Sequence, residues 1–301
     1  MNQENIIGVK NLTKTYGKNR GIIDINLDVH RGEVFGYLGP NGAGKTTTIR
    51  LLLDFIRPSS GSATIFGLDT RQSSVAVHRR LGYLPGELAV YSDLTGEEFL
   101  KYIANLRGDI DWHFVDGLVK RLEADLKRKL RTLSHGNRQK IGLIQAFMHQ
   151  PELVMLDEPT TGLDPLMQQE FYRLVEEAKA RGGTVFLSSH IIPEVERVCD
   201  RVGIIREGRL VAVETIDALK SRAARRLEIH FAGPVDKSIF ASLPGIRELK
   251  IDNNILSCSI IGSLDTLIKT AARYEVVNVI SRETSLEDVF LTYYAEEKKI
   301  A

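Results

Sequence analysis

The stretch GPNGAGKT, residues 39–46, combines residue types that can hold a chain of phosphate groups. It fits the pattern G-x-x-x-x-G-K-[ST] at every fixed position. Its glycines permit unusual backbone dihedral angles, so successive N–H groups can point inward at an anion. A Gly-rich turn with a chance Lys is the alternative. However, an apolar strand pattern precedes the stretch and a helical pattern follows it, as the motif requires. We therefore predict a nucleotide-phosphate site here.

The residues of this loop have separate expected roles. The Lys45 ammonium would bridge the β- and γ-phosphates, and the Thr46 hydroxyl would complete the ligand shell of Mg²⁺. The Thr47 hydroxyl could donate to the α-phosphate, and the dipole of the following helix favours the same anion. The rest of the loop would surround the phosphates: Gly39, Pro40, Asn41, Gly42, Ala43 and Gly44.

Two further apolar runs end in residues that could act on a phosphate. LVMLDEP, residues 153–159, delivers Asp157 and Glu158 at the C-terminal end of a strand, where ligand sites of α/β proteins lie. Asp157 would hold Mg²⁺, and Glu158 is the candidate general base for an attacking water. TVFLSSH ends in His190, which could contact the γ-phosphate and orient that water. Acidic pairs and structural His residues also occur at strand ends by chance, but the phosphate loop upstream favours the functional interpretation.

A third stretch, LSHGNRQK at residues 133–140, opens a helical pattern with small polar residues. Such residues usually cap a helix by accepting hydrogen bonds from its free N–H groups. The same N–H groups can instead bind an anion. The stretch by itself leaves both interpretations open.

The elements that must position these residues follow an alternating pattern. Apolar strand patterns alternate with helical ones around a helical insertion, which predicts a mostly parallel α/β sheet. From residue 226 onward the order becomes β-α-β-β-α-β with a last helix at 285–297, compatible with a small ferredoxin-like unit. We therefore divide the chain into residues 1–220, with the helical insertion at about 88–150, and residues 221–301.

The composition excludes several classes of protein. The chain has 301 residues, 43% of them hydrophobic and 26% charged, as in ordinary soluble proteins of two domains. A formal net charge of +1 argues against a general nucleic-acid binder. Cys199 and Cys258 stand far apart, which predicts neither a disulfide framework nor a zinc site. No apolar run approaches the roughly 20 residues of a membrane span, and the N-terminus lacks a signal core.

Taken together, the motifs resemble those of one family. GPNGAGKTT, LSHGN, LVMLDEP, GLDP and SSH occur in the order and spacing of the ATP-binding subunit of ABC transporters. The C-terminal unit, which ends in SLEDVFLTYY, looks like the tail of drug, antibiotic and lipid exporters of the ABC type 2 class. The daunorubicin- and bacitracin-resistance pumps belong to that class. The resemblance covers residues 6–214 for the shared motifs.

This resemblance implies a fold and an activity. The fold would be a P-loop NTPase of ABC type, with a RecA-like α/β core, an antiparallel β subdomain and a helical subdomain that touches a transmembrane permease. Tyr16 would stack on adenine, although a plain sheet-edge Tyr is the alternative. The active unit would be a head-to-tail dimer, in which Ser134, Gly136 and Asn137 of one copy meet the ATP of the other. Asp164, in the GLDP turn, would also lie at the nucleotide.

The sequence departs from the family pattern at two places. The usual Leu-Ser-Gly-Gly-Gln has His135 for its first Gly and Asn137 for its Gln, and we expect His135 to face away from the phosphate. In GYLPGEL, Gly86 stands where most members carry a Gln that senses Mg²⁺ and water. Glu87 follows and could take over that place at the metal.

We therefore expect an ATP-hydrolysing subunit that powers export of drugs, antibiotics or lipid-like compounds through a separate permease, at the cytoplasmic face of the membrane. Two alternatives remain. One is a non-transport ABC ATPase, disfavoured by the single phosphate loop and the lack of a long coiled coil. The other is a nucleotide-dependent resistance or regulatory protein with little hydrolysis, disfavoured by the presence of both Glu158 and His190. The cargo is not readable from the sequence.

Overall fold

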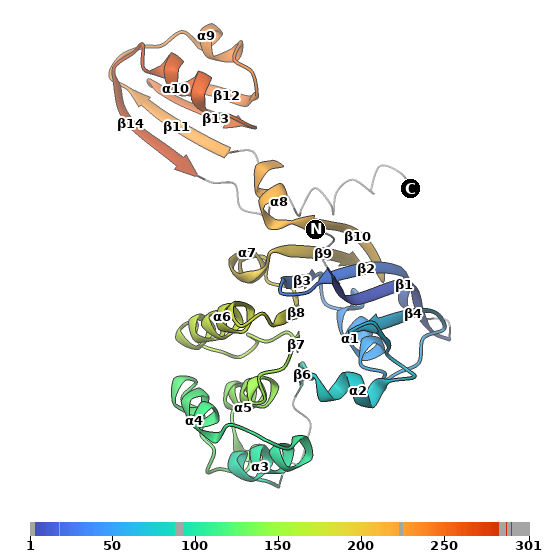
Figure 1. Ribbon diagram of the computed structural model, residues 1–301. Helices are drawn as coiled ribbons and strands as arrows, with labels where there is room; N and C mark the ends of the chain where they lie inside the picture. Colours follow the sequence, from blue (N-terminus) through green and yellow to red (C-terminus); the bar gives the residue numbers. More distant parts are fainter. Residues whose placement is uncertain are drawn as a thin grey trace. The chain divides into compact units, whose positions relative to one another are not determined.

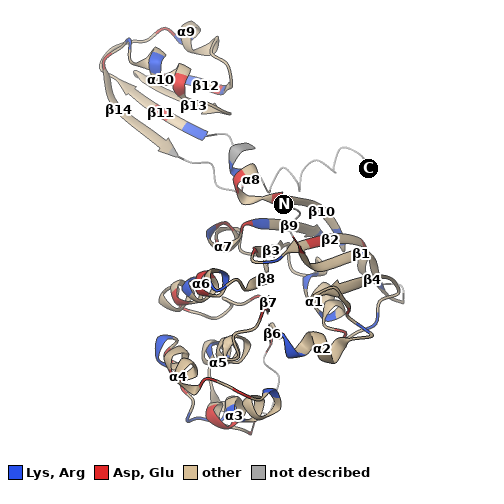
Figure 2. Ribbon diagram, viewed as in Figure 1, with Lys and Arg blue, Asp and Glu red and all other residues tan. Residues whose placement is uncertain are grey.

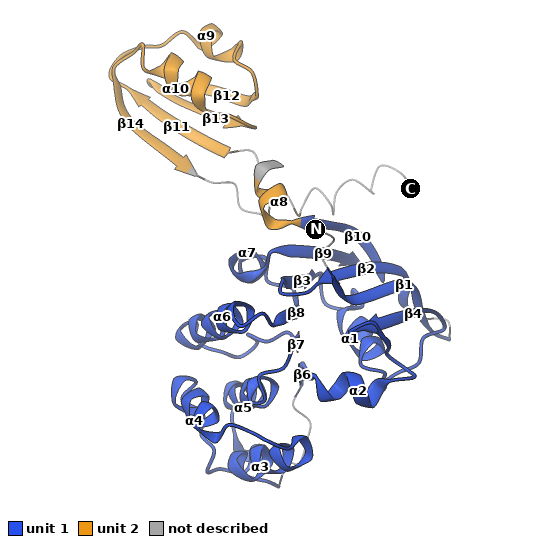
Figure 3. Ribbon diagram, in the orientation of Figure 1, with its two compact units in different colours: residues 1–214 blue, residues 215–301 orange. Residues whose placement is uncertain are grey.

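The computed structural model describes residues 4–17, 19–87, 93–222, 225–282, 287 and 290. The chain divides into two units, Met1–Glu214 and Thr215–Ala301 (Figures 1 and 3). The sequence pattern predicts this division at residue 220 instead, which falls within helix α8 (Ile216–Arg222).

A six-stranded sheet forms the centre of the first unit, in the order β10-β9-β3-β8-β7-β6. The pairs that join β9, β3, β8, β7 and β6 are all parallel, as the alternating pattern predicts. Parallel strands bring their carboxyl ends to one edge, which is where α/β proteins bind ligands. The strands are β3 (Val34–Leu38), β6 (Leu81–Leu84), β7 (Leu153–Asp157), β8 (Thr184–Ser189), β9 (Arg201–Arg206) and β10 (Arg209–Thr215).

Helices connect these strands, and their first residues come from the motifs. Helix α1 (Lys45–Leu52) follows β3 after the loop at residues 39–44, and α7 (Ile192–Val198) follows β8. Helix α6 (Pro165–Ala180) begins at Asp164, whose Oδ1 accepts hydrogen bonds from two N–H groups of the first turn. Asp164 therefore satisfies donors that an uncapped helix would leave free.

A second sheet in the first unit is antiparallel and has the order β2-β1-β4-β5. Its strands alternate buried apolar and exposed polar residues, so one face can pack on a core. That face contributes Ile7, Ile22 and Ile65 to the hydrophobic core shared with Phe35 and Phe186 of the central sheet. The strands are β1 (Asn5–Tyr16), β2 (Asn19–His30), β4 (Ser60–Ile65) and β5 (Leu68–Asp69), followed by helix α2 (Ser74–Arg79).

The predicted helical insertion forms a bundle of short helices between β6 and β7 (Figure 1). Its first helix is closed by a capping box, in which Thr95 and Glu98 each bind the backbone of the other. Arg121 joins Glu170 and Glu177 of α6, which ties the bundle to the core. The helices are α3 (Gly96–Arg107), α4 (Trp112–Arg121), the 3-10 turn η1 (Leu130–Thr132) and α5 (His135–Phe147).

Among the described residues, every helix is too short or too polar to span a bilayer.

The second unit begins with α8 and continues in the β-α-β-β-α-β order that the sequence predicts. Its sheet is antiparallel in the order β12-β13-β11-β14, and β12 and β13 are joined across Asn253 and Asn254, both with left-handed φ. The elements are β11 (Arg225–Phe231), α9 (Lys237–Ala241), β12 (Ile246–Asp252), β13 (Ile255–Ile260), α10 (Asp265–Ala271) and β14 (Val276–Arg282). The helix expected at 285–297 lies outside the described residues except at positions 287 and 290.

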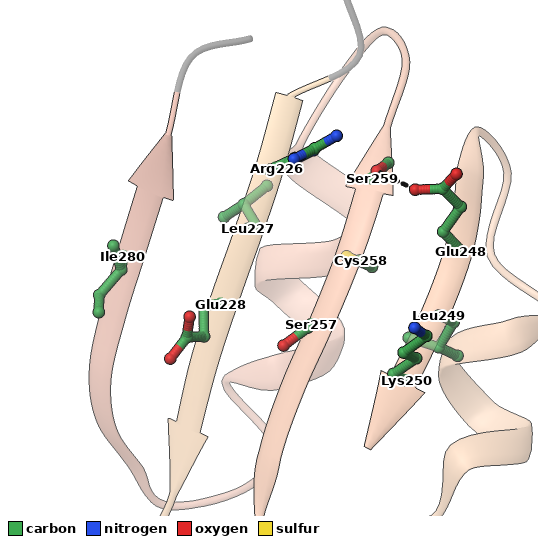
Figure 4. A pocket seen from close by; sticks show the side chains of 10 residues that line it. All are labelled: Arg226, Leu227, Glu228, Glu248, Leu249, Lys250, Ser257, Cys258, Ser259 and Ile280. Carbon is green, nitrogen blue, oxygen red and sulfur yellow. Dashed lines mark hydrogen bonds between the residues drawn. The ribbon is translucent and has the colours of Figure 1, made fainter. Parts of the chain in front are cut away.

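The two faces of this small sheet differ in chemistry. Leu227 and Leu256 belong to an apolar core that also contains Phe240 of α9 and Leu267 of α10. The opposite face, open in Figure 4, carries Glu228 beside its partners in register, Ser257 and Ile280. It lines a shallow hollow of about 620 Å³.

Candidate active site

The loop at residues 39–46 is held between the central sheet and strand β2. Strand β3 is buried at all five positions and delivers Gly39, whose N–H donates to the Ser189 carbonyl at 3.2 Å. Gly44 has φ 111°, and a Cβ there would lie 2.7 Å from Ile22 Cγ2. Only glycine fits this combination of dihedral angle and close approach. The loop therefore makes a sharp turn between the end of β3 and the start of α1.

Lys45, the first residue of α1, turns its side chain back over the loop. It is 5% exposed, and its Nζ donates to the Gly39 carbonyl at 2.6 Å and to the Pro40 carbonyl at 3.2 Å. The same Nζ lies 3.0 Å from Glu158 Oε1. A buried ammonium is tolerated when it is paired and hydrogen-bonded in this way. The cation is therefore available at the loop without being exposed to bulk water.

Thr46 and Asp157 are brought together although 111 positions separate them in the chain. The Thr46 hydroxyl donates to Asp157 Oδ2 at 2.8 Å, and the Ser188 hydroxyl donates to Asp157 Oδ1 at 2.6 Å. Asp157 is 2% exposed, so the two hydroxyls compensate the burial of its charge. Hydroxyl and carboxylate oxygens are the ligand types that Mg²⁺ prefers, so this pair fits such an ion.

Glu158 follows Asp157 but points elsewhere because its backbone is left-handed, with φ 52°. Such a conformation is costly for a residue with a side chain and often marks a functional place. Its N–H lies 3.2 Å from both the carbonyl and the hydroxyl oxygen of Ser188. Its Oε2 lies 2.7 Å from His190 Nδ1, while Oε1 faces Lys45. The carboxylate is thus held between a cation and an imidazole at the sheet edge.

Gln139 is a residue of this site that sequence reasoning missed. It is 2% exposed, and its Nε2 donates to the carbonyl oxygens of Glu158 and Pro159, at 3.2 and 2.9 Å. Ser188 was missed as well, although it is the first residue of the SSH ending of its strand. Nothing in the pattern around Gln139 distinguishes it from a polar residue on a helix surface.

The 134–137 stretch combines a cap with a close contact inside the chain. Ser134 is exposed and caps α5 by accepting from the Asn137 N–H at 3.2 Å. A Cβ on Gly136 would lie 2.4 Å from the Gly162 carbonyl oxygen, and one on Gly162 would lie 2.4 Å from the His135 ring. The stretch therefore packs on the 160–164 loop, with His135 turned toward that loop. Asn137 Oδ1 accepts from the Asp125 N–H, so its amide faces the helical insertion.

Tyr16 and Thr47 both lie near the phosphate loop. The Tyr16 ring is 46% exposed at the end of β1, and Lys14 Nζ lies 5.3 Å from its centroid. A Cβ on Gly21 would meet this ring at 3.1 Å, and one on Gly44 would meet the Gly21 carbonyl at 3.4 Å. Gly21 therefore lies close both to this ring and to Gly44 of the loop. Thr47 is partly buried in the first turn of α1.

Gly86 and Glu87 occupy different surroundings. A Cβ on Gly86 would lie 3.4 Å from Asp157 Oδ2, so the backbone itself comes close to the carboxylate. Glu87 is exposed and lines a groove with Arg50, Phe55 and other residues. Within the part of the chain that the structure describes, no hydrogen bond joins Glu87 to Thr46 or Asp157. Its role as a metal ligand stays a prediction.

The chain is similar to known proteins in sequence and in fold. Residues 22–161 match the model of the ABC transporter family. The bacitracin transport ATP-binding protein BcrA of Bacillus licheniformis is 36% identical over 95% of this chain and 96% of its own length. A solved ATP-binding subunit of an ABC transporter is 32% identical, with a TM-score of 0.66 over 71% of this chain and 92% of that one. The dimeric structure of MJ0796, a bacterial ABC transporter cassette, has a TM-score of 0.64 at 23% identity, over 70% of this chain and 98% of that one.

Proposed function

This chain belongs to the ATP-binding subunits of ABC transporters. On that basis we propose that it hydrolyses ATP to drive export of a drug-, antibiotic- or lipid-like compound through a separate transmembrane permease. One observation carries the chemical part of the proposal. Lys45, Glu158 and His190, from three distant segments, converge at one edge of the parallel sheet within 3.0 Å contacts. BcrA, similar along its whole length and named for bacitracin transport, supports the export part.

The phosphate loop would hold the nucleotide. Backbone N–H groups of Asn41, Gly42 and Gly44 and of the start of α1 would provide donors and a positive dipole for the β- and γ-phosphates. Lys45 would exchange its contact with Glu158 for a contact with those phosphates, which gains a charge-assisted hydrogen bond. The exposed ring of Tyr16 would stack on the adenine.

Thr46 and Asp157 would hold Mg²⁺, since they supply a hydroxyl and a carboxylate oxygen side by side. A bound Mg²⁺ would neutralise charge on the transferred phosphoryl group. Ser188 fixes the Asp157 carboxylate by its hydrogen bond to Oδ1, so the remaining oxygen keeps its direction. Glu87, next to Gly86, would be a further ligand of the same ion.

Hydrolysis would use Glu158 as general base. Once Lys45 turns to the phosphates, Glu158 Oε1 becomes free to accept a proton from water, while Ser188 and Gln139 keep its backbone in place. His190, which contacts Oε2, would orient the water and meet the γ-phosphate. A positioned general base contributes roughly a hundred- to ten-thousandfold to the rate.

A second copy would complete the site. Ser134 and Gly136 stand at the start of α5, and the phosphates of this chain are already served by its own loop. The exposed hydroxyl of Ser134 is suited to the γ-phosphate of a second copy, and Asp164 would lie at the same interface. The dimeric MJ0796 cassette supports a dimer of this kind.

The permease would dock beside the helical insertion, at the cytoplasmic face of the membrane. A groove of about 440 Å³ lies there, and Phe55 in its wall is 55% exposed. Large exposed aromatic side chains commonly mark a surface for a protein partner. The groove is lined by apolar and charged residues that include Arg50, Leu53, Phe55, Tyr83, Glu87, Phe99 and Arg107.

Glu158→Gln tests the proposal. The amide keeps the size of the side chain but cannot take a proton, so we expect turnover of ATP to fall by at least about a hundredfold. Binding of ATP, measured by calorimetry, should remain within about threefold of wild type. Wild-type turnover in this variant, measured with and without the permease, would contradict the proposal.

A further inference from the structure

The buried carboxyl of Glu194 lies near the site but outside every stretch that predicts chemistry. Glu194 stands in the first turn of α7 and is 1% exposed. Its Oε2 accepts a hydrogen bond from the Ser189 hydroxyl at 2.5 Å. Among the described residues, no hydrogen bond reaches its Oε1. A buried acid with one unsatisfied oxygen is costly for the fold, so its presence needs a reason other than packing.

Ser189 connects this carboxyl to the backbone of residues 189–191 through hydrogen bonds. Its hydroxyl donates to Glu194 and accepts from the Ile191 N–H at 2.9 Å, while its carbonyl accepts from the Gly39 N–H. His190 lies between Ser189 and Ile191. Because the hydroxyl proton is directed at Glu194, its lone pairs are turned to Ile191, and the backbone on both sides of His190 is fixed.

Glu194 also lies next to the segment that carries Glu158. The hydroxyl of Thr160, two residues after Glu158, is close enough to Glu194 to favour its ionised form. Thr160 is 4% exposed, so it faces the same buried region. The carboxyl is therefore bonded to the segment that carries His190 and is influenced by the segment that carries Glu158.

The pKa of Glu194 is raised, and the charged side chains of Glu158 and His190 contribute to its value. Burial raises its pKa to about 7, against the hydroxyls of Ser189 and Thr160, which favour the ionised form. Glu158 raises this pKa further and His190 lowers it. The other titratable groups that sense Glu194 are Tyr172 of α6 and Cys199 at the end of α7. Near neutral pH a large share of the carboxyls is uncharged, and an amide resembles that form.

We propose that Glu194 is a positioning residue for ATP hydrolysis. Through Ser189 it fixes the turn that carries His190, and so holds the imidazole against Glu158. This inference rests on the proposed roles of Glu158 and His190.

Steady-state kinetics of two variants of the full chain test the proposal. Glu194→Ala frees the Ser189 hydroxyl and should lower kcat about ten- to hundredfold, because small misplacements of catalytic groups have effects of that size. The KM for ATP should change by less than about threefold, since the phosphate loop is untouched. Glu194→Gln keeps an uncharged acceptor for Ser189 and should retain at least about a third of wild-type kcat.

Ser189→Ala provides a second, independent arm. It removes the same hydrogen bond from the other side, so its kcat should resemble that of Glu194→Ala, and the double variant should be no slower than either. This arm decides the matter if Glu194→Ala does not fold. If the fold losses of kcat in the two single variants multiply in the double variant, Glu194 does not act through Ser189 and the proposal is overturned.

Glu33→Ala is the matched control. Glu33 is also buried, at 8% exposure, but it binds Arg201 and the His30 N–H at the opposite end of β3. Its loss should lower the melting temperature without lowering kcat. Wild-type kcat in Glu194→Ala, or equal losses in Glu194→Ala and Glu194→Gln, overturns the positioning role. If Glu158→Gln is inactive in the same series, the proposed function stands; if it is active, the proposed function fails.

Discussion

The two units of the chain treat charge differently. Both carry Lys, Arg, Asp and Glu along their elements (Figure 2). Among the described residues, however, only the first unit buries any of them, whereas the buried polar residues of the second unit are Ser259 and Thr270. The buried charged residues of the first unit are Glu33, Lys45, Asp157, Glu170 and Glu194.

The first unit buries charged residues at its candidate active site, whereas the described core of the second unit consists of apolar side chains. Removing an ion from water costs several kcal/mol unless partners compensate it. Lys45 and Asp157 have such partners at the carboxyl edge of the central sheet, which is the edge that binds ligands. The second unit instead closes its core with Phe231, Phe240 and Tyr274, whose ring centroids lie 5.8–5.9 Å apart. We therefore expect substitutions to act on different observables in the two units.

The largest expected effect is on the stability of the second unit. Phe240 is 0% exposed, and Phe240→Ala should destabilise this unit by about 3–5 kcal/mol through the cavity it leaves. Trp112, the single tryptophan, lies in the first unit, so its fluorescence follows that unit while circular dichroism follows both. In urea, circular dichroism should show an earlier transition while the Trp112 transition stays in place. An equal shift of both signals would contradict the separation of the two cores.

Next in size is the pH dependence caused by Glu194. Because its folded pKa is raised, this carboxyl contributes most to stability below its unfolded pKa, and that contribution is lost as pH rises to about 7. Glu194→Gln should therefore gain up to about 3 kcal/mol relative to wild type between pH 4.5 and pH 8. Urea unfolding at both pH values measures the change.

Glu152 offers a control of opposite sign, whose change falls between pH 4.5 and about pH 2 rather than between pH 4.5 and pH 8. Hydrogen bonds from Arg80 and Arg31 lower its pKa to about 2, so its contribution is present above the unfolded pKa and is lost as pH falls. The difference in the free energy of unfolding between Glu152→Gln and wild type should therefore disappear as pH falls to about 2. If the difference in the free energy of unfolding between Glu194→Gln and wild type does not vary with pH, the raised pKa of Glu194 is contradicted.

A smaller effect is expected for the affinity of the nucleotide. Lys45→Ala removes a charge-assisted hydrogen bond to phosphate, which corresponds to about a ten- to hundredfold weaker Kd for ATP. Calorimetry with Lys179→Ala as control measures this, because Lys179 pairs with Asp200 and is 43% exposed. Equal Kd values for the two variants would show that the buried cation does not serve the nucleotide.

The smallest effect should come from the charged open face of the second unit. Glu228 Oε1 lies 2.7 Å from His230 Nε2, and both side chains are partly exposed. Glu228→Gln should change the free energy of unfolding by less than about 0.5 kcal/mol and leave ATP turnover as it is. A loss above 2 kcal/mol would show that this unit also depends on charge.

Much of the candidate active site could be predicted from sequence, because its residues stand at the ends of strands. Residues 39–46, Asp157, Glu158 and His190 each follow an apolar strand, and parallel strands bring such residues to one edge. Gln139 and Glu194 could not be predicted in this way. Both lie on helices, and their partners become visible only when the backbone of residues 158–160 and 189–191 is in place. For the same reason, the close contact of His135 with Gly162 carries no signal in the sequence.

Helix α5 has a consequence that concerns cooperativity. Ser134 stands at its start, toward the ATP that we assign to a second copy, and Gln139 on the same helix holds the backbone of Glu158 in its own copy. A hydrogen-bonded helix moves as a unit over so short a distance. A shift of Ser134 on contact with the ATP bound by the second copy would then move the backbone of Glu158, the proposed general base of the first copy. Hydrolysis in such a dimer should depend sigmoidally on ATP concentration, with a Hill coefficient that approaches about 2, the number of its sites.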